Sequence, residues 1–226
     1  MNAIRKTADR VLAGMLALEF LLAVIYLVGV FQTGQPWAAF DFDGLRTVPS
    51  LLQSAHLFLL GLVPAVVMGL AQPNKRSPSR SLLLALTVLF LYAALDETFK
   101  FHLTLGHQAW RFVYIGAGTA IPVVFHRQLH RLWHQYRRAV KFAIAGFVVF
   151  VLGGFGTELL KIYLLAPAFA ALPVRYGGLT AELEAVRVAI EEFAELVGES
   201  LTLYGMSLVA AECLTPAPEP NDPPQI

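Results

Sequence analysis

Cysteine and charge are the two things of which this sequence has least. Its 226 residues include a single cysteine, Cys213, which excludes a disulfide-stabilised scaffold, a CxxC redox pair and a cysteine-based zinc site. Charged residues make up 15% of the chain, and the formal net charge is +1. Soluble domains carry about 25% charged residues, so this composition disfavours an ordinary soluble enzyme. The small net charge also excludes a nucleic-acid-binding protein that works through bulk positive charge.

Long apolar runs are abundant, since hydrophobic residues make up 57% of the sequence. A transmembrane helix needs about 20 mainly apolar residues. Six stretches approach or exceed this length: 11–31, 51–71, 82–102, 110–125, 139–165 and 188–211. They are too long and too continuously apolar to be strands. We therefore predict an all-α fold, a polytopic transmembrane bundle of six helices that occupies residues 1–213.

Lysine and arginine are distributed unequally between the segments that join these stretches. Eleven of the 17 precede the first stretch, lie between the second and third or the fourth and fifth, or lie at the very start of the fifth: Arg5, Lys6, Arg10, Lys75, Arg76, Arg80, Arg127, Arg131, Arg137, Arg138 and Lys141. Short loops rich in positive charge face the cytoplasm. We expect both termini to be cytoplasmic, in a multi-pass protein of the cell membrane, most simply the inner membrane of a bacterium. The Pro-rich residues 214–226 are expected to form a disordered cytoplasmic tail.

Ionisable side chains interrupt the predicted spans, where a charge costs about 2.5–3.5 kcal/mol and normally faces the bundle interior or a water-filled cavity. Eight of them are acids: Glu19, Asp96, Glu97, Glu158, Glu191, Glu192, Glu195 and Glu199. Four cations lie near them in the sequence: Lys100, Arg111, Lys161 and Arg187. Nearly all the acids, and His56, fall in the half of the bundle that faces away from the cytoplasm. Crowded buried carboxylates either take up protons or bind a cation, so the sequence predicts an acidic chamber with that property.

Carboxylate oxygens with one or two imidazoles suit a divalent metal cation such as Ca²⁺, Mn²⁺, Fe²⁺ or Zn²⁺. The predicted ligands are Asp96, Glu158, Glu195 and Glu199, with His56 and His102 as further candidates. A bound metal would lower the pKa of a water molecule, and Glu195 or Glu199 would act as the catalytic base. The resulting hypothesis is a metal-dependent hydrolase that acts on lipid.

Each of these features also has a purely structural interpretation. The last four glutamates fall within an arc of about 100° on a helix, but the first two of them would be solvated if that helix began later. Glu158 with Lys161, and Asp96 with Lys100, have the spacing of structural ion pairs. Glu19 alone would be satisfied by a hydrogen bond to a neighbouring helix. His56 would then be a packed, hydrogen-bonded histidine.

Two other function classes fit the same residues. A proton- or cation-coupled transporter needs acidic groups at membrane depth, although no internal repeat of the kind common in transporters is present. A b-type haem-binding or structural membrane subunit is the other class, because His56 and His102 lie at similar predicted depth and would provide two axial ligands. The sequence names neither the substrate nor an oligomeric state.

The stretch 126–141 combines histidines with basic residues. His126, His130 and His134 recur every four residues, a spacing that can bind a metal. The stronger interpretation is a basic helix that lies among anionic lipid headgroups. The headgroup contacts are predicted at Arg127, Arg131, Arg137 and Arg138.

Two short elements resemble known membrane proteins. Asp96-Glu97 followed by His102 forms a DE-x4-H element, and residues 191–198 form an EE-x2-E-x2-G element. Both are similar to elements of a group of uncharacterised bacterial multi-pass membrane proteins, in which a second acid often stands where this chain has Leu103. That resemblance implies a multi-pass membrane fold and no particular activity.

A distant analogy is to the alkaline ceramidase-type membrane hydrolases, which build a zinc site from His, Asp and Ser. Their Ser-x3-His and His-x3-His pairs have no match at the right depth here. Ser54 and His56 have the wrong spacing, and the pairs formed by His126, His130 and His134 lie on the wrong side of the predicted bundle. Neither activity nor residues are carried over from that family.

Overall fold

The computed structural model describes residues 2–71, 77–101, 109–170 and 177–215, and these form helices and short connections without any strand. The helices are α1 (Asn2–Thr33), η1 (Ala38–Phe40), α2 (Val48–Leu70), α3 (Arg80–Phe99), α4 (Ala109–Val124), α5 (His126–Gln135), α6 (Arg137–Val151), η3 (Leu152–Gly156), α7 (Thr157–Leu160), η4 (Lys161–Leu165), α8 (Ala166–Ala170) and α9 (Gly177–Leu214). The all-α prediction is confirmed. The tail predicted at 214–226 lies almost wholly outside the described residues.

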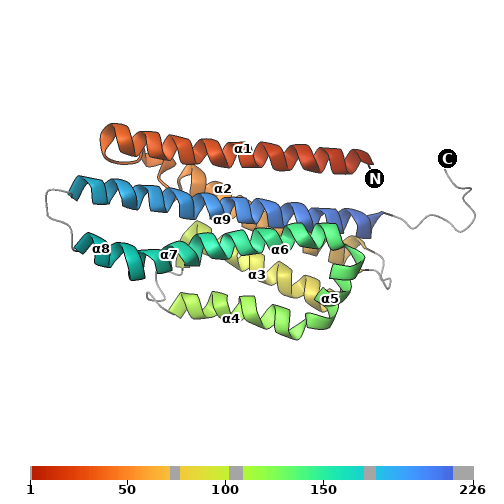
Figure 1. Ribbon diagram of the computed structural model, residues 1–226. Helices are drawn as coiled ribbons and strands as arrows, with labels where there is room; N and C mark the ends of the chain where they lie inside the picture. The colour runs from red at the N-terminus through yellow and green to blue at the C-terminus, as the bar shows by residue number, and fades with distance from the viewer. Residues whose placement is uncertain (1, 72–76, 102–108, 171–176, 216–226) are drawn as a thin grey trace, which may run out of the picture.

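The long helices run roughly parallel or antiparallel to one another and form an elongated bundle (Figure 1). α9 is central, because it packs against α1, α2 and α6, while α3 packs against α2. The first residues of α1 and the last residues of α9 lie at the same end of the bundle, where the short α5 crosses it (Figure 1). Side chains from α1, α2, α3 and α9 therefore share one interior.

Within the described residues, three helices are long and apolar enough to cross a membrane: Ile4–Thr33, Val48–Leu70 and Arg80–Phe99. Their outer faces carry exposed apolar side chains, among them Phe20, Leu21 and Phe31 on α1 and Leu84 and Val88 on α3. Proteins dissolved in water rarely expose apolar surface on this scale, whereas lipid tails solvate it well. The structure thus supports a membrane protein.

Three predictions differ from the structure, and the first is the start of α1, which lies at Asn2 and not at the predicted residue 11. The stretch 139–165 is divided into α6, η3, α7, η4 and α8, and η3 and η4 are π-helical turns. Three of the five residues of η3 are Gly153, Gly154 and Gly156, which weaken the regular α-helical pattern. The last helix begins at Gly177, well before the predicted residue 188. The interpretation in which this helix starts after the first acids of its stripe is therefore wrong.

Glycines allow α6 and α9 to approach each other closely. A methyl group at Gly205 would lie 2.7 Å from the backbone nitrogen of Ala143, and one at Gly198 would lie 2.7 Å from the carbonyl oxygen of Gly146. Such small-residue contacts are a usual way for membrane helices to pack, because dispersion forces replace the hydrophobic effect there. The close approach holds α9 against α6 on one side while its acids face the interior.

Replacing Gly205 by Ala should destabilise the bundle by about 1–3 kcal/mol, because the added methyl group meets backbone atoms that have no room to move. The measurement is the thermal unfolding midpoint of detergent-purified protein, followed by circular dichroism. Gly14→Ala is the matched control, since a methyl group there meets nothing within 4 Å. Equal midpoints for the two variants would show that the glycine contact is not needed.

Candidate functional site

The most isolated polar group in the bundle interior is the side chain of Glu199 on α9. It is 2% exposed, and neither carboxylate oxygen has a hydrogen-bond partner among the described residues. It faces His56 on α2, whose Nδ1 lies 3.6 Å from Glu199 Oε2. That distance is too long for a hydrogen bond. His56 is also 2% exposed, and its Nδ1 has no hydrogen-bond partner in the described part of the chain.

A second buried carboxylate comes from the middle of α1. Glu19 is fully buried, and the hydroxyl of Ser200 on α9 donates a hydrogen bond to its Oε1. Its other oxygen, Oε2, has no hydrogen-bond partner among the described residues. The prediction that Glu19 bonds a neighbouring helix is thus confirmed for one of its two oxygens. Ser200, which binds Glu19 of α1, directly follows Glu199 in α9. The two buried glutamates are therefore associated with adjacent positions of the same helix.

Glu195 lies one turn before Glu199 on the same helix. Its Oε2 accepts a hydrogen bond of 2.9 Å from the side-chain amide of Gln53 on α2. Its Oε1 lies against Gly154 of η3, and a methyl group at that glycine would collide with the oxygen. The glycine-rich π-helical turn therefore provides the space that Glu195 occupies.

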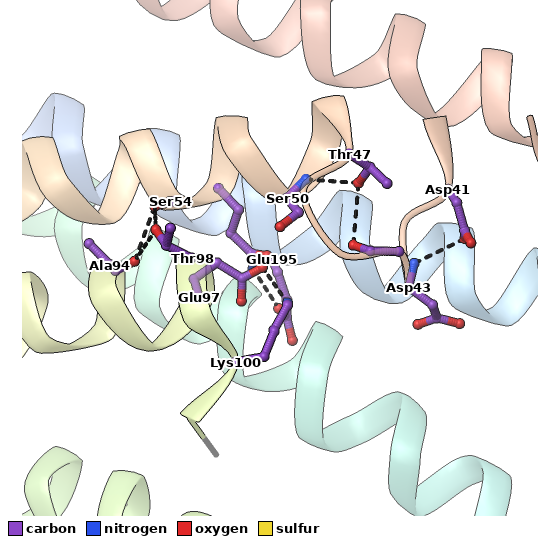
Figure 2. Close-up of polar contacts among 12 residues, drawn as sticks. Asp41, Asp43, Thr47, Ser50, Ser54, Ala94, Glu97, Thr98, Lys100 and Glu195 are labelled. Carbon is purple, nitrogen blue, oxygen red and sulfur yellow. Dashed lines mark hydrogen bonds and ion pairs between the residues drawn. The ribbon is translucent and has the colours of Figure 1, made fainter. Parts of the chain in front are cut away.

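The end of α3 brings a third set of polar groups to this interior. Glu97 and Lys100 form an ion pair, and both lie close enough to Glu195 to influence its charge. Figure 2 shows these three side chains meeting at the end of α3. Beside them, the Ser54 and Thr98 hydroxyls are 2.6 Å apart, and each donates to the carbonyl oxygen of Ala94. The Glu97–Lys100 pair forms in place of the predicted pair of Lys100 with Asp96.

The connection between α1 and α2 covers this end of the bundle. Phe42 is 3% exposed and packs its ring against that of Tyr26, with 5.1 Å between the ring centroids. Burial, and then the charge of Asp41, raises the pKa of the neighbouring Asp43. Asp41 Oδ1 accepts a hydrogen bond from the backbone amide of Asp43 (Figure 2). The connection therefore adds further acidic groups at the same end.

Cations at the start of α9 pair with the outermost acids. Arg187 donates two hydrogen bonds to Glu184 and one to Glu191, and Lys161 donates one of 2.6 Å to Glu184. Among the described residues, Lys100, Lys161 and Arg187 are therefore all engaged in ion pairs. Within the same described set, no Lys or Arg lies within ion-pair distance of the deeper acids, which are Glu19, Glu192, Glu195 and Glu199.

The predicted metal ligands are only partly brought together. His56 faces Glu199, Glu195 lies one turn away, and Asp96 is buried at the end of α3. His102 and the side chain of Glu158 lie outside the described residues. Among the side chains that are described, no group of three or more His, Cys, Asp or Glu could hold a metal ion. A divalent metal, and with it the lipid hydrolase, stays a prediction.

Two polar residues of this interior were missing from the predicted site. Gln53 lies three residues before His56, and Ser200 directly follows Glu199. Helical spacing would have found Gln53, because residues three apart share a face. The sequence contains no comparable signal for Ser200, which points toward α1 while its neighbour Glu199 points toward α2.

The basic stretch forms α5, at the end of the bundle opposite the acids (Figure 1). Nε2 of His130 and Nε2 of His134 are 3.2 Å apart, and both side chains are exposed. Arg131 donates a hydrogen bond of 3.0 Å to the carbonyl oxygen of Ser77, which ties α5 to the segment before α3. The histidines therefore lie far from the acidic interior.

Replacing Ser200 by Ala should lower stability by about 1–3 kcal/mol, because Glu19 would lose its one described hydrogen bond while it stays buried. The measurement is the thermal unfolding midpoint in detergent. In a Glu19→Leu background the same substitution should cost much less, since no buried acceptor is left without a partner. An equal cost in both backgrounds would mean that the hydrogen bond contributes nothing.

The Glu184 network should make stability depend on pH. Hydrogen bonds from Arg187 and Lys161 hold the pKa of Glu184 below its usual 4.5, against the opposing effect of burial. The stabilisation is therefore present above about pH 4.5 and is lost as pH falls through the lowered pKa. We expect Glu184→Gln to lower the unfolding midpoint at pH 6 and to have less effect as the pH approaches 3. The exposed Glu182→Gln is the control; a pH-independent loss in Glu184→Gln would contradict this expectation.

Comparison with known proteins identifies a family but no activity. A search of curated proteins and a search of solved structures each found no match. Residues 10–210 match the family described as "Domain of unknown function (DUF8692)", and this match includes α2, α3, most of α1 and nearly all of α9. The chain therefore belongs to the DUF8692 family.

Proposed function

We propose that the protein is a multi-pass membrane protein that takes up and releases a proton at Glu199, as a proton-coupled carrier requires. The observation that carries this proposal is the isolation of the Glu199 side chain. It is 2% exposed, and its two oxygens lack hydrogen-bond partners in the described structure. A charged carboxylate without partners is far costlier to bury than a neutral carboxylic acid.

The electrostatic surroundings of Glu199 also favour its neutral form. Glu192 and Glu195 on α9 and Glu97 on α3 act on it with negative charge, whereas the side-chain amide of Gln53 on α2 acts in the opposite sense. The facing group on α2 is His56, which lies at 3.6 Å and would repel a proton only if it were itself charged. Lys100 at the end of α3 pairs with Glu97. Since three acids face Glu199 and no free cation does so in the described structure, a proton is the simplest cation to neutralise it.

A proton fits the described geometry better than a metal does. A metal site needs three or more ligands, and no such group exists among the described side chains. A proton needs only one carboxylate oxygen, and His56 Nδ1 provides a second acceptor nearby. Acidic residues at membrane depth are also what proton pathways use.

The proposal includes an orientation. With six spans and both termini in the cytoplasm of a bacterial cell, the acids of α3 and α9 would open to the opposite side. The basic α5 and the start of α6 would then lie among the anionic headgroups of the cytoplasmic leaflet. The residues proposed to contact these headgroups are Arg127, Arg131, Arg137 and Arg138.

Infrared difference spectroscopy tests the proton on Glu199 directly. A protonated carboxyl group has a carbonyl stretching band that a carboxylate lacks. At pH 7 the purified protein in lipid should show this band, and it should lose intensity when the pH is raised. Glu199→Gln should remove a part of the band, because the amide has no carboxylic proton.

Glu182→Gln is the control, since that side chain is exposed. It should leave the carboxyl band unchanged. If Glu199→Gln also leaves the band unchanged, Glu199 is ionised at neutral pH and the proposed function is wrong. Elemental analysis of the same sample shows whether a metal takes the place of the proton.

A further inference from the structure

An apolar cavity lies in the middle of the bundle beside Glu199. Its volume is about 490 Å³, within the range of sites for small organic ligands. Residues of α2, α3, α4, α6 and α9 form its wall, and they include the apolar side chains of Leu60, Leu89, Phe90 and Phe147. Of the described residues that line it, Glu199 is the one with an ionisable side chain.

The wall and Glu199 impose different requirements on a ligand. The apolar wall favours a hydrocarbon body, because burying apolar surface is the main source of affinity there. The oxygens of Glu199 lack described partners and need hydrogen-bond donors or a positive charge. An anionic lipid would be repelled by this carboxylate, and a plain hydrocarbon would leave it unsatisfied. A molecule with an apolar body and a positively charged donor group meets both requirements.

The position of the cavity indicates how such a ligand arrives. Leu57 and Leu60 lie near the middle of α2, and Leu89 and Phe90 near the middle of α3. Both helices are long and apolar enough to cross a membrane, so this depth corresponds to lipid tails. A second apolar cavity of about 330 Å³ shares Phe90 and Phe147 with the first and extends toward α5. There is therefore room for a long apolar tail.

We propose that this cavity binds a lipophilic primary amine, with the ammonium group against Glu199 and the tail along the apolar wall. The inference rests on the proposed function, since the amine takes the place of the proton on Glu199. The exchange is balanced: the amine enters as the ammonium ion, Glu199 releases its proton, and the carboxylate remains paired with the bound ammonium. The substrate class of the carrier would then be lipophilic amines that exchange for protons.

The experiment measures binding of radiolabelled dodecylamine to the purified full-length protein in lipid nanodiscs, with protein-free nanodiscs as the blank. Binding at pH 7 should saturate near one molecule per chain. Unlabelled dodecylamine should compete, whereas dodecanol, which has the same chain but no charge, should not. Glu199→Gln should weaken binding by about ten-fold or more, because one partner of a buried charge pair is lost.

A pair of glycine variants on α4 tests the cavity itself. Gly118 lines the cavity and Gly116 does not, and a methyl group at either position meets nothing within 4 Å. Gly118→Leu should fill the cavity and abolish dodecylamine binding while the Glu199 carboxyl band persists. Gly116→Leu should change neither. If Gly118→Leu fails to fold by circular dichroism, Ala93→Leu fills the same cavity from α3.

The outcomes separate this inference from the proposed function. A carboxyl band from Glu199 without saturable amine binding overturns the amine site and leaves the proton proposal standing. Amine binding without that band overturns the proton proposal and leaves the binding site. Equal competition by dodecanol, or unchanged binding in Glu199→Gln, overturns recognition of the ammonium group. Unchanged binding in a folded Gly118→Leu protein overturns the location.

Discussion

The cost of removing carboxylates from water is the constraint on which the rest of this structure depends. Glu19 and Glu199 are almost completely buried, and the Lys and Arg side chains described near them pair with other acids. Each feature of the interior reduces that cost for one group: Ser200 for Glu19, Gln53 for Glu195, and Lys100 for Glu97. Neither oxygen of Glu199 has a hydrogen-bond partner among the described residues, and for this reason we propose Glu199 as the group that binds a proton or a cation.

The sequence predicts the all-helical fold well, because long and continuously apolar runs are typical of membrane-crossing helices. Where no water can satisfy the backbone, a long apolar run must form a helix. The apolar runs therefore locate α2, α3, α4 and the end of α1 to within a few residues. The start of α1, the start of α9 and the division of the stretch 139–165 are the exceptions. The first turns of α1 and α9 extend beyond the apolar runs into polar residues, where hydropathy carries no signal.

The site is less predictable than the fold. Helical spacing correctly places Glu195 and Glu199 on an interior face, and membrane depth correctly associates His56 with them. Which groups touch depends on helix rotation and on close packing, and neither can be read from one sequence. Gly154 shows this clearly, because its role is to leave space for Glu195. The DUF8692 family has no known function, so membership of it assigns no role to these residues. The roles proposed for them therefore depend on the geometry.

The most direct test of this account is the protonation state of the Glu199 side chain in lipid at neutral pH. Solid-state ¹³C NMR of protein labelled at glutamate carboxyl carbons can measure it, with Glu199→Gln to identify the resonance. The account predicts the chemical shift of a neutral carboxylic acid at pH 7, changing to that of a carboxylate only in more alkaline solution. A carboxylate shift at pH 7 and throughout the titration would contradict it.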